Sequence, residues 1–173
     1  MAQLNFDSGE KVPLALLQPP KSMRLRPVTM SDVEVLLRSC LTDRTLNSVR
    51  LLLERATRLY EQGRGIGVVA ETADKRVIGY GQLTIWSACG EISDLTVAEA
   101  ERGRGYGTGI IQRLVQTAVE RRVKCIEIGA ALSNPRAVAL YRRLGFRDER
   151  QLFLNLGSGN EPVIYLRLDL GRR

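Results

Sequence analysis

The sequence predicts an α/β fold, in which one domain is built on a mixed, mostly antiparallel sheet flanked by helices. Three observations support this prediction. The chain has 173 residues, close to the usual size of one domain. Apolar residues recur with helical spacing in some segments and follow strand patterns in others. These segments follow one another in the order β-α-α-β-β-β-α-β-α-β-β, and we expect residues 1–22 to be an N-terminal arm and residues 23–173 to be the domain.

The first third of the chain predicts one strand and two helices. Residues 23–28 form a short extended segment. Ser31 and Glu34 have the Ser-x-x-Glu spacing of a capping box, which predicts that a helix starts there. Two apolar stripes with helical spacing follow, so we expect both helices to lie before Gly63.

The middle of the chain changes to strand patterning. Residues 66–71, 76–86 and 89–97 are rich in Val, Ile, Thr and aromatic residues and are separated by short turns. Strands joined by such turns pair antiparallel. After a Gly-rich stretch, residues 110–120 carry an apolar stripe opposite polar side chains, which predicts an amphipathic helix.

The last part of the chain predicts a strand, a helix and a final strand pair. Residues 124–130 have the composition of a buried strand, and residues 134–144 have helical spacing. Residues 147–156 and 162–170 are strand-like and flank a Gly-Ser-Gly-Asn turn. A mixed sheet flanked by helices is the compact arrangement that suits this order.

The chain contains no histidine, and this restricts its chemistry more than any other feature. Ser-His-Asp and Cys-His nucleophiles and all His-ligated metal sites are excluded, so we expect no metal. Cys40, Cys89 and Cys125 are odd in number and far apart, without a Cys-x-x-Cys pair. We therefore expect neither a disulfide framework nor a zinc site, and a cytoplasmic location. We also expect no signal peptide and no membrane span.

The net charge is +7, from 26 Lys and Arg residues against 19 Asp and Glu residues. An excess of this size suggests an anionic partner, such as a phosphate-bearing cofactor, a nucleic acid or an acidic membrane surface. Residues 98–150 hold 11 basic and 6 acidic side chains, so a net +5 surrounds the Gly-rich stretch. The charge alone does not choose among these partners.

The Gly-rich stretch lies where a strand ends and a helix begins. Glycines at positions 103, 105, 107 and 109 let backbone amides face one point, and the helix N-terminus adds the positive end of its dipole. Arg102 and Arg104 beside the helix start suit phosphate contacts. The alternative is a flexible connection with two solvated arginines. A Walker loop is excluded because Gly-Lys-Ser/Thr is absent.

Two motifs resemble those of the GCN5-related N-acetyltransferase (GNAT) superfamily. Arg102-Gly-Arg-Gly-Tyr-Gly107 fits the acetyl-CoA signature Arg/Gln-x-x-Gly-x-Gly/Ala. Residues 134–146 read Asn-Pro-Arg-Ala-Val-Ala-Leu-Tyr-Arg-Arg-Leu-Gly-Phe and fit the second signature, Asn-x-x-Ala-x-x-Leu-Tyr-x-x-x-Gly-Phe. The resemblance covers about residues 23–170, and the element order inferred above matches that GNAT-like fold.

The resemblance implies a set of residues that bind acetyl-CoA. Backbone groups of Leu95, Thr96 and Val97 would pair with the pantetheine arm, which fills a gap between the fourth and fifth strands like an added strand. Asn134 would contact the pantetheine or its neighbourhood, although an Asn before Pro also suits a plain helix cap. The amides that would hold the diphosphate belong to Arg102, Gly103, Arg104, Gly105, Tyr106, Gly107 and Thr108.

Tyr141 and Glu91 are the candidate catalytic residues. The resemblance implies that Tyr141 meets the thioester sulfur and, as general acid, protonates the departing CoA thiolate; a tyrosine packed in the core is the alternative. The attacking amine needs a base, and Glu91 and Asp94 lie on the strand that borders the acetyl group. Strand alternation places these two carboxylates on opposite faces. We favour Glu91, which stands where the histone-acetylating branch carries its catalytic Glu.

Two positions on the next strand bear on the substrate. Acetyltransferases of ribosomal-protein N-termini carry a Glu where this chain has Gly129, which argues against a similar peptide substrate. Glu127 could play a related part, although a solvent-facing strand residue is the simpler explanation.

The sequence therefore predicts an acetyl-CoA-dependent N-acyltransferase, which moves an acetyl group to an amine through a ternary complex with direct attack. No acyl-enzyme is expected, because Cys89 and Cys125 have no His to activate them. The alternatives are a catalytically silent acyl-CoA-binding sensor module and a nucleic-acid-binding protein. We expect no nucleic acid, because the tyrosines are not interleaved in a basic strand platform. The resemblance makes a homodimer a candidate assembly and leaves the amine unidentified.

Overall fold

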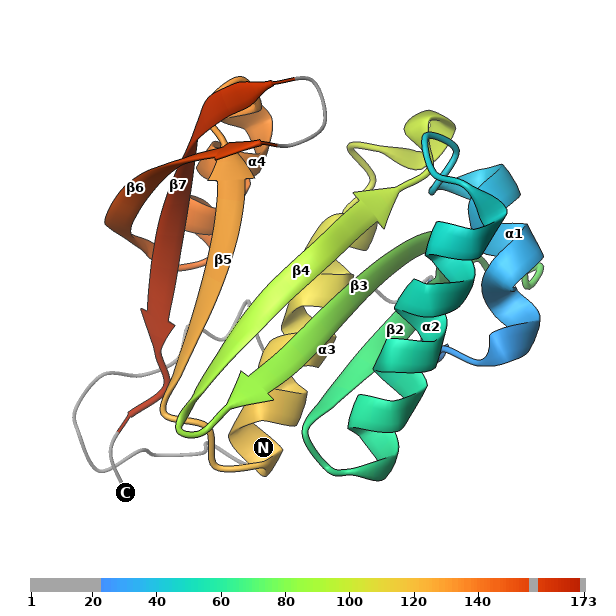
Figure 1. The fold of residues 1–173 in the computed structure, drawn as a ribbon, viewed down its shortest axis with the longest axis horizontal. Coiled ribbons are helices and arrows are strands. Elements are labelled where there is room, and N and C mark those ends of the chain that lie inside the picture. The colour runs from blue at the N-terminus through green and yellow to red at the C-terminus, as the bar shows by residue number, and fades with distance from the viewer. Residues whose placement is uncertain (1–22, 156–158, 172–173) are drawn as a thin grey trace.

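The computed structural model describes residues 23–155 and 159–171, so the arm expected at residues 1–22 lies outside the described part. A seven-stranded sheet has the strand order β1-β2-β3-β4-β5-β7-β6 (Figure 1). The predicted fold class and element order are confirmed. The strands are β1 (Arg24–Pro27), β2 (Gly65–Glu71), β3 (Val77–Trp86), β4 (Cys89–Val97), β5 (Cys125–Ala131), β6 (Arg147–Asn155) and β7 (Asn160–Asp169). The helices are α1 (Val33–Ser39), α2 (Leu46–Glu61), α3 (Tyr106–Glu120) and α4 (Pro135–Arg143), with the 3-10 helices η2 (Met30–Asp32) and η3 (Glu99–Glu101).

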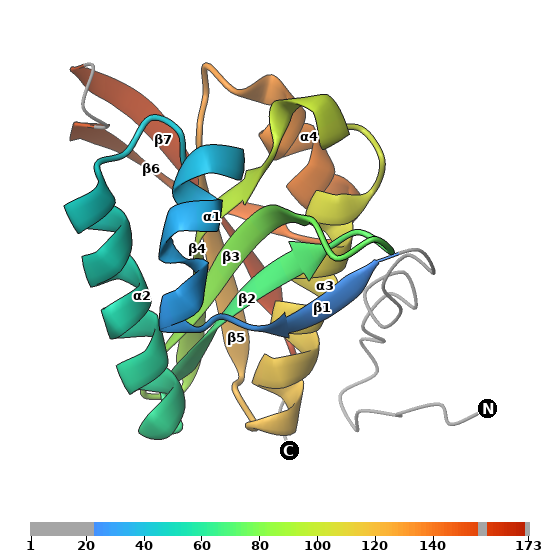
Figure 2. The ribbon, with the colours of Figure 1, turned by 90° about the vertical axis from the view of Figure 1, so that its right-hand side faces the viewer.

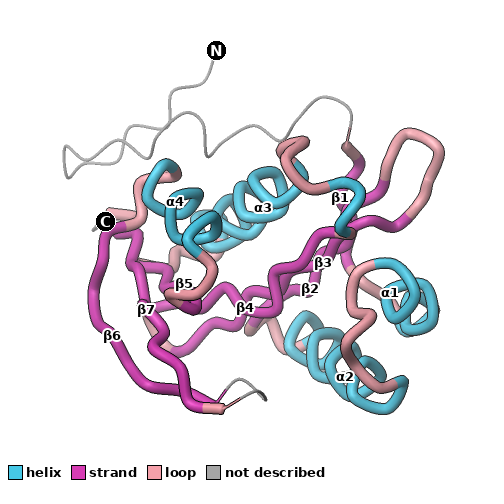
Figure 3. Tube along the Cα trace, turned by 90° about the horizontal axis from the view of Figure 1, so that it is seen from above, coloured by secondary structure: helices cyan, strands magenta, loops and turns pink. Residues whose placement is uncertain are grey.

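Helices cover both faces of the sheet, with α1 and α2 on one face and α3 and α4 on the other (Figures 2 and 3). The larger apolar cluster lies under α3 and α4 and includes the fully buried Ile110 and Leu114. The smaller cluster joins α1 and α2 to β2 and β3 and includes Leu53 and Tyr80. Each fully buried side chain of this size stabilises the fold by about 1.5–3 kcal/mol. The sheet is therefore a fixed platform on which the loops at its edge are held.

The pairing of β4 with β5 is parallel, and its ladder is short. It runs over four residue pairs, from Cys89 with Cys125 to Ile92 with Ile128. Beyond these pairs the two strands diverge (Figure 1), while β3 continues to pair with β4 and β7 with β5. Within residues 23–155 and 159–171, the backbone of β4 after Ile92 therefore has no strand partner on the β5 side.

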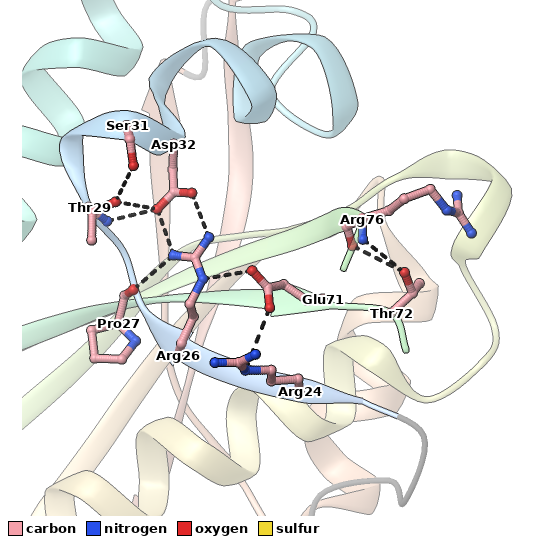
Figure 4. A network of polar contacts seen from close by, with 9 residues as sticks. All are labelled: Arg24, Arg26, Pro27, Thr29, Ser31, Asp32, Glu71, Thr72 and Arg76. Atoms are coloured by element: carbon pink, nitrogen blue, oxygen red, sulfur yellow. Dashed lines mark hydrogen bonds and ion pairs between the residues drawn. The ribbon is translucent and has the colours of Figure 1, made fainter. Parts of the chain in front are cut away.

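A charged corner fixes β1 against β2 (Figure 4). Arg26 on β1 donates to the two carboxylate oxygens of Asp32 at 2.8 and 2.7 Å, and its Nε donates to Glu71 Oε1 at 2.7 Å. Asp32 and Glu71 are buried, with exposures of 3% and 6%. Buried carboxylates need such partners, because an unpaired charge in the interior is strongly destabilising.

The first helical segment begins earlier than the sequence predicts. Thr29 is the N-cap of η2, and its amide donates to the Asp32 carboxylate at 2.8 Å. The predicted capping box of Ser31 and Glu34 is therefore wrong by two residues. Asp32 satisfies the free amide at the helix start, and Arg26 holds that carboxylate in place.

A disulfide joins Cys89 on β4 to Cys125 on β5. The two residues are direct partners in the parallel ladder, with their Cα atoms 4.7 Å apart. The expectation that the cysteines form no disulfide is therefore wrong for this pair, and Cys40 is the free cysteine of the described chain. The pairing depends on strand register between residues 36 apart in sequence, which the cysteine spacing does not reveal.

Candidate active site

The Gly-rich stretch connects β4 and η3 to the start of α3. Gly103 and Gly105 have φ angles of 78° and 85°, the left-handed region that glycine adopts without strain. The amide of Gly109 donates to the Gly105 carbonyl at 3.0 Å, as the first hydrogen bond of the helix. The amides from Tyr106 to Thr108 therefore have no acceptor within the helix. No other acceptor for them lies in the described part of the chain, and they lie at the positive end of the helix dipole, where anions bind.

The surroundings of the loop leave room for a ligand. A Cβ atom added at Gly103 would meet nothing within 4 Å. One added at Gly107 would meet only Val97 at 3.8 Å and Leu140 at 4.0 Å, which is ordinary contact. Val97 ends β4 and Leu140 lies on α4, so the two sequence motifs meet at Gly107. The amides at the helix start and the open space at Gly103 fit a diphosphate.

The two arginines of the loop are exposed and each is held by a neighbour. Arg102 Nε donates to the Val97 carbonyl at 3.2 Å. Arg104 Nη1 donates to Glu101 Oε2 at 3.0 Å. Because a guanidinium has five N–H donors, most remain free for phosphate oxygens. Both arginines thus suit an anion at the start of α3.

The three β4 residues expected to pair with pantetheine lie beyond the parallel ladder. Leu95 and Val97 pack against the apolar cluster under α3. The Thr96 hydroxyl donates to the Cys40 carbonyl at 2.9 Å, on the α1 side. No β5 residue pairs with this part of β4. Its free edge matches the requirement of an extended chain that adds to a sheet.

The second motif lies on α4. Asn134 is its N-cap, and its Oδ1 accepts from the Ala137 amide at 3.2 Å, so the capping role considered for this residue is present. Tyr141 is 5% exposed, and its ring centroid lies 6.3 Å from that of Phe146 in the larger apolar cluster. Burial raises the pKa of Tyr141 to about 12. The hydroxyl therefore keeps its proton at neutral pH.

Strand alternation predicts that the two candidate bases, Glu91 and Asp94, lie on opposite faces of the sheet. This prediction is wrong. The register between β3 and β4 shifts at a bulge, and Asp94 has a φ of 53° within it. An extra residue of this kind resets the alternation of side chains. Asp94 consequently turns toward the connection between α1 and α2, where Arg44 Nη2 donates to its Oδ1 at 2.6 Å.

Glu91 lies in a polar row on the face opposite α3 and α4. Its β3 partner is Thr84, and its β5 partner is Glu127. The Thr84 hydroxyl accepts from Gln82 at 3.2 Å, and Gln82 accepts from Tyr80 at 3.0 Å. Tyr80 belongs to the cluster under α1 and α2, which identifies the face. Glu91 and Tyr141 are therefore on opposite faces of the sheet.

Glu127 is occupied by a partner from the neighbouring strands. Arg150 donates to it at 2.6 Å and lies 4.6 Å above the Tyr165 ring. This hydrogen bond lowers the pKa of Glu127. Burial, and next the charge of Glu91, raise the pKa of Tyr165. Glu91 makes no ion pair among the described residues, whereas Glu127 is held by Arg150.

Sequence reasoning missed Arg44 and Glu101, which hold two of the candidate residues. Arg44 lies outside both motifs, and its contact with Asp94 spans 50 residues. Glu101 directly precedes the first motif, but its burial depends on packing of η3. Within residues 23–155 and 159–171, no three His, Cys, Asp or Glu residues gather where they could hold a metal ion. The helices in these ranges are too short or too polar to cross a membrane.

Two curated relatives match part of the chain. An uncharacterized N-acetyltransferase of Methanocaldococcus jannaschii is 34% identical over 59 residues, which cover 34% of this chain and 26% of that protein. An N-alpha-acetyltransferase of Arabidopsis thaliana is 34% identical over 64 residues, which cover 37% of this chain and 34% of that protein. The matched segments thus span about a quarter and about a third of these relatives.

A solved structure and a family model extend the match. The N-acetyltransferase of Staphylococcus aureus Mu50 superposes with a TM-score of 0.74 at 18% identity, over 87% of this chain and 99% of that one. The model of the acetyltransferase (GNAT) family matches residues 34–146, a range that includes both the loop before α3 and the motif on α4. The chain therefore belongs to the GNAT acetyltransferase family.

Proposed function

We propose that the protein transfers an acetyl group from acetyl-CoA to an amine within a ternary complex. One observation carries the proposal: the edge of β4 that opens after Ile92 leads directly into the free amides at the start of α3. An extended pantetheine arm suits the open strand edge, and a diphosphate suits the amides. Membership of the family supports acyl transfer, and this geometry supports acetyl-CoA as the donor.

Different residues would bind different parts of acetyl-CoA. Backbone groups of Leu95, Thr96 and Val97 would hold the pantetheine arm, and the amides from Arg102 to Thr108 would hold the diphosphate. Asn134, which caps α4, would keep that helix beside the arm. A backbone N–H of β4 near Leu95 or Val97 would stabilise negative charge on the thioester oxygen during attack.

Tyr141 would provide the proton that the leaving sulfur needs. Acetyl transfer breaks the C–S bond, and protonation of the departing thiolate drives this step. Burial keeps the Tyr141 hydroxyl protonated. The same apolar surroundings disfavour a bare thiolate, which raises the affinity of that sulfur for a proton.

Glu91 would take a proton from the amine, directly or through a water molecule. An ammonium group cannot attack a thioester until it loses a proton. Asp94 is held by Arg44 and Glu127 by Arg150, so of these three carboxylates Glu91 is our candidate base. Since Glu91 and Tyr141 lie on opposite faces, the donor and the amine would approach from opposite sides and meet between β4 and β5.

A pair of substitutions at Thr108 tests anion binding at α3. Thr108→Glu and Thr108→Gln place side chains of equal length in the first helical turn, and they differ by one charge. An acidic residue there stabilises the helix through its dipole but repels a diphosphate. We expect Thr108→Glu to keep or raise the melting temperature and to bind CoA about 10-fold more weakly than Thr108→Gln in calorimetry at low salt.

A substitution further along the same helix serves as the control. Gln116→Glu adds the same charge away from the loop and should leave the affinity for CoA unchanged. Equal affinities of the two Thr108 variants would contradict the proposed site. Release of free thiol from acetyl-CoA with a panel of amines then tests catalysis, because binding without turnover of any amine would indicate a sensor module.

A further inference from the structure

A buried carboxylate lies directly before the Gly-rich loop. A negative charge at this place is unfavourable if the loop binds an anion. Glu101 is 8% exposed and ends η3, one residue before Arg102. Its negative charge opposes a nearby diphosphate by Coulomb repulsion. The contacts of Glu101 indicate what its carboxylate does at this place.

Two arginines neutralise Glu101 from different parts of the chain. Arg104 Nη1 donates to its Oε2 at 3.0 Å, from within the Gly-rich loop. Arg76 Nη2 donates to its Oε1 at 3.5 Å, from the turn between β2 and β3. Each carboxylate oxygen thus has its own guanidinium, and Glu101 connects the Gly-rich loop to the β2–β3 hairpin.

Arg76 is itself held in the turn. Its amide donates to the Thr72 hydroxyl at 3.1 Å (Figure 4), and its Nε donates to Asp74 at 2.9 Å. The Thr72 amide donates to the Arg76 carbonyl at 3.0 Å, which closes the turn. The arginine that reaches Glu101 therefore starts from a fixed backbone.

We propose that Glu101 is a positioning residue for the diphosphate of the acyl donor and acts through Arg104. It holds the Arg104 guanidinium beside the loop and uses one of its five N–H donors, so the others stay free for phosphate oxygens. With Arg76, it also ties η3 to the β2–β3 turn, which keeps the amides after Gly105 in place. This inference rests on the proposed function, because it requires a donor that carries a diphosphate.

The experiment compares acetyl-CoA with S-acetylpantetheine, which keeps the thioester and the pantetheine arm but lacks the diphosphate and the nucleotide attached to it. Glu101→Gln keeps the shape of the side chain and removes its charge, so it cannot hold both arginines equally well. We expect the KM for acetyl-CoA to rise about 10-fold, the effect of one charge-assisted hydrogen bond, with kcat little changed. The rate with S-acetylpantetheine, a thioester without the diphosphate, should not change.

Two further variants separate positioning from general destabilisation. Glu99→Gln removes a charge from the exposed side of the same η3 and should leave the KM for acetyl-CoA unchanged. Arg76→Gln lies on an exposed turn and should raise this KM by a smaller factor. The double variant Arg76→Gln/Glu101→Gln should bind acetyl-CoA no more weakly than Glu101→Gln alone, because both changes break the same link.

The outcomes distinguish this inference from the proposed function. If the unmodified protein binds no CoA, both fail. If it binds CoA and Glu101→Gln binds equally well or more tightly, the positioning role of Glu101 is overturned while the proposed function stands. An equal loss of rate with both acyl donors would also overturn this role. If Glu101→Gln does not fold, an unchanged KM for acetyl-CoA in Arg76→Gln would overturn it instead.

Discussion

The Tyr141 ring packs within the larger apolar cluster beside Phe146, and only its hydroxyl distinguishes it from a phenylalanine there. Tyr141→Phe therefore keeps the packing and removes the proton donor. We expect kcat to fall about 100-fold, within the usual range for loss of a general acid, while CoA affinity and melting temperature hardly change. Steady-state detection of free thiol checks this, with Tyr60→Phe on the exposed side of α2 as control.

The dependence of kcat on pH provides a second test of the role of Tyr141. Because burial raises the pKa of Tyr141 to about 12, its hydroxyl stays protonated throughout the neutral range and should not bend the profile of kcat there. An unchanged kcat in Tyr141→Phe would assign this tyrosine to the core alone.

Glu91 and Glu127 are direct neighbours in the parallel ladder, on the face of the sheet opposite Tyr141. They provide a matched comparison. Glu91→Gln should lower kcat/KM for the amine about 100-fold at neutral pH, because no carboxylate then removes the proton of the amine. This rate should recover as pH rises, since the amine loses its proton to solvent. Glu127→Gln should have a much smaller effect, because Arg150 already holds that carboxylate. Equal losses in the two variants would refute the assignment of Glu91 as base.

Among the structural elements, the corner between β1 and η2 depends on buried charge. Asp32→Asn removes one of the two carboxylate partners of the Arg26 guanidinium and should lower the free energy of unfolding by about 2–4 kcal/mol at neutral pH. Urea denaturation measures this, and Asp43→Asn, an exposed residue before α2, should change little. An equal effect of both substitutions would show that burial of the pair is unimportant.

The same corner predicts a pH dependence of stability. Burial raises the pKa of Asp32, but hydrogen bonds from Arg26 and the Thr29 amide outweigh it, and the net pKa is lowered. A lowered pKa in the folded state stabilises the protein above the ordinary value of about 4, and this contribution is lost as the pH falls through the folded pKa. The stability difference between the unmodified protein and Asp32→Asn should therefore narrow in acid below about pH 4.

Local patterns were sufficient to predict the elements, whereas contacts between distant elements were not predictable. Apolar spacing and glycine breaks lie within each segment, so the order of strands and helices follows from them. The helix start was misplaced because Asp32, fixed by Arg26 from another strand, satisfies the Thr29 amide. The face of Asp94 and the pairing of Cys89 depend on register across the sheet, which no local pattern records.

For the molecule as a whole, one covalent link joins the two parts of the sheet. A bond between Cys89 and Cys125, 36 residues apart, restricts the unfolded chain and should stabilise the fold by about 2–4 kcal/mol. We expect Cys89→Ala/Cys125→Ala to melt several degrees lower than the unmodified protein. Dithiothreitol should lower the melting temperature of the unmodified protein and of Cys40→Ala, but not that of the double variant. A melting temperature insensitive to dithiothreitol would mean that these cysteines are unpaired in solution.

Strand pairing between β1 to β4 and β5 to β7 is limited to the four pairs of the parallel ladder, and the disulfide lies at the start of that ladder. Because so few strand pairs join the two groups of strands, each group should unfold locally on its own. Amide hydrogen exchange should therefore resolve two cooperative units with different protection. A thioester lying across the divergence would bridge both units and make them exchange together. The divergence of β4 and β5, which gives the acyl donor its place, would thus also let the bound donor stabilise the whole sheet.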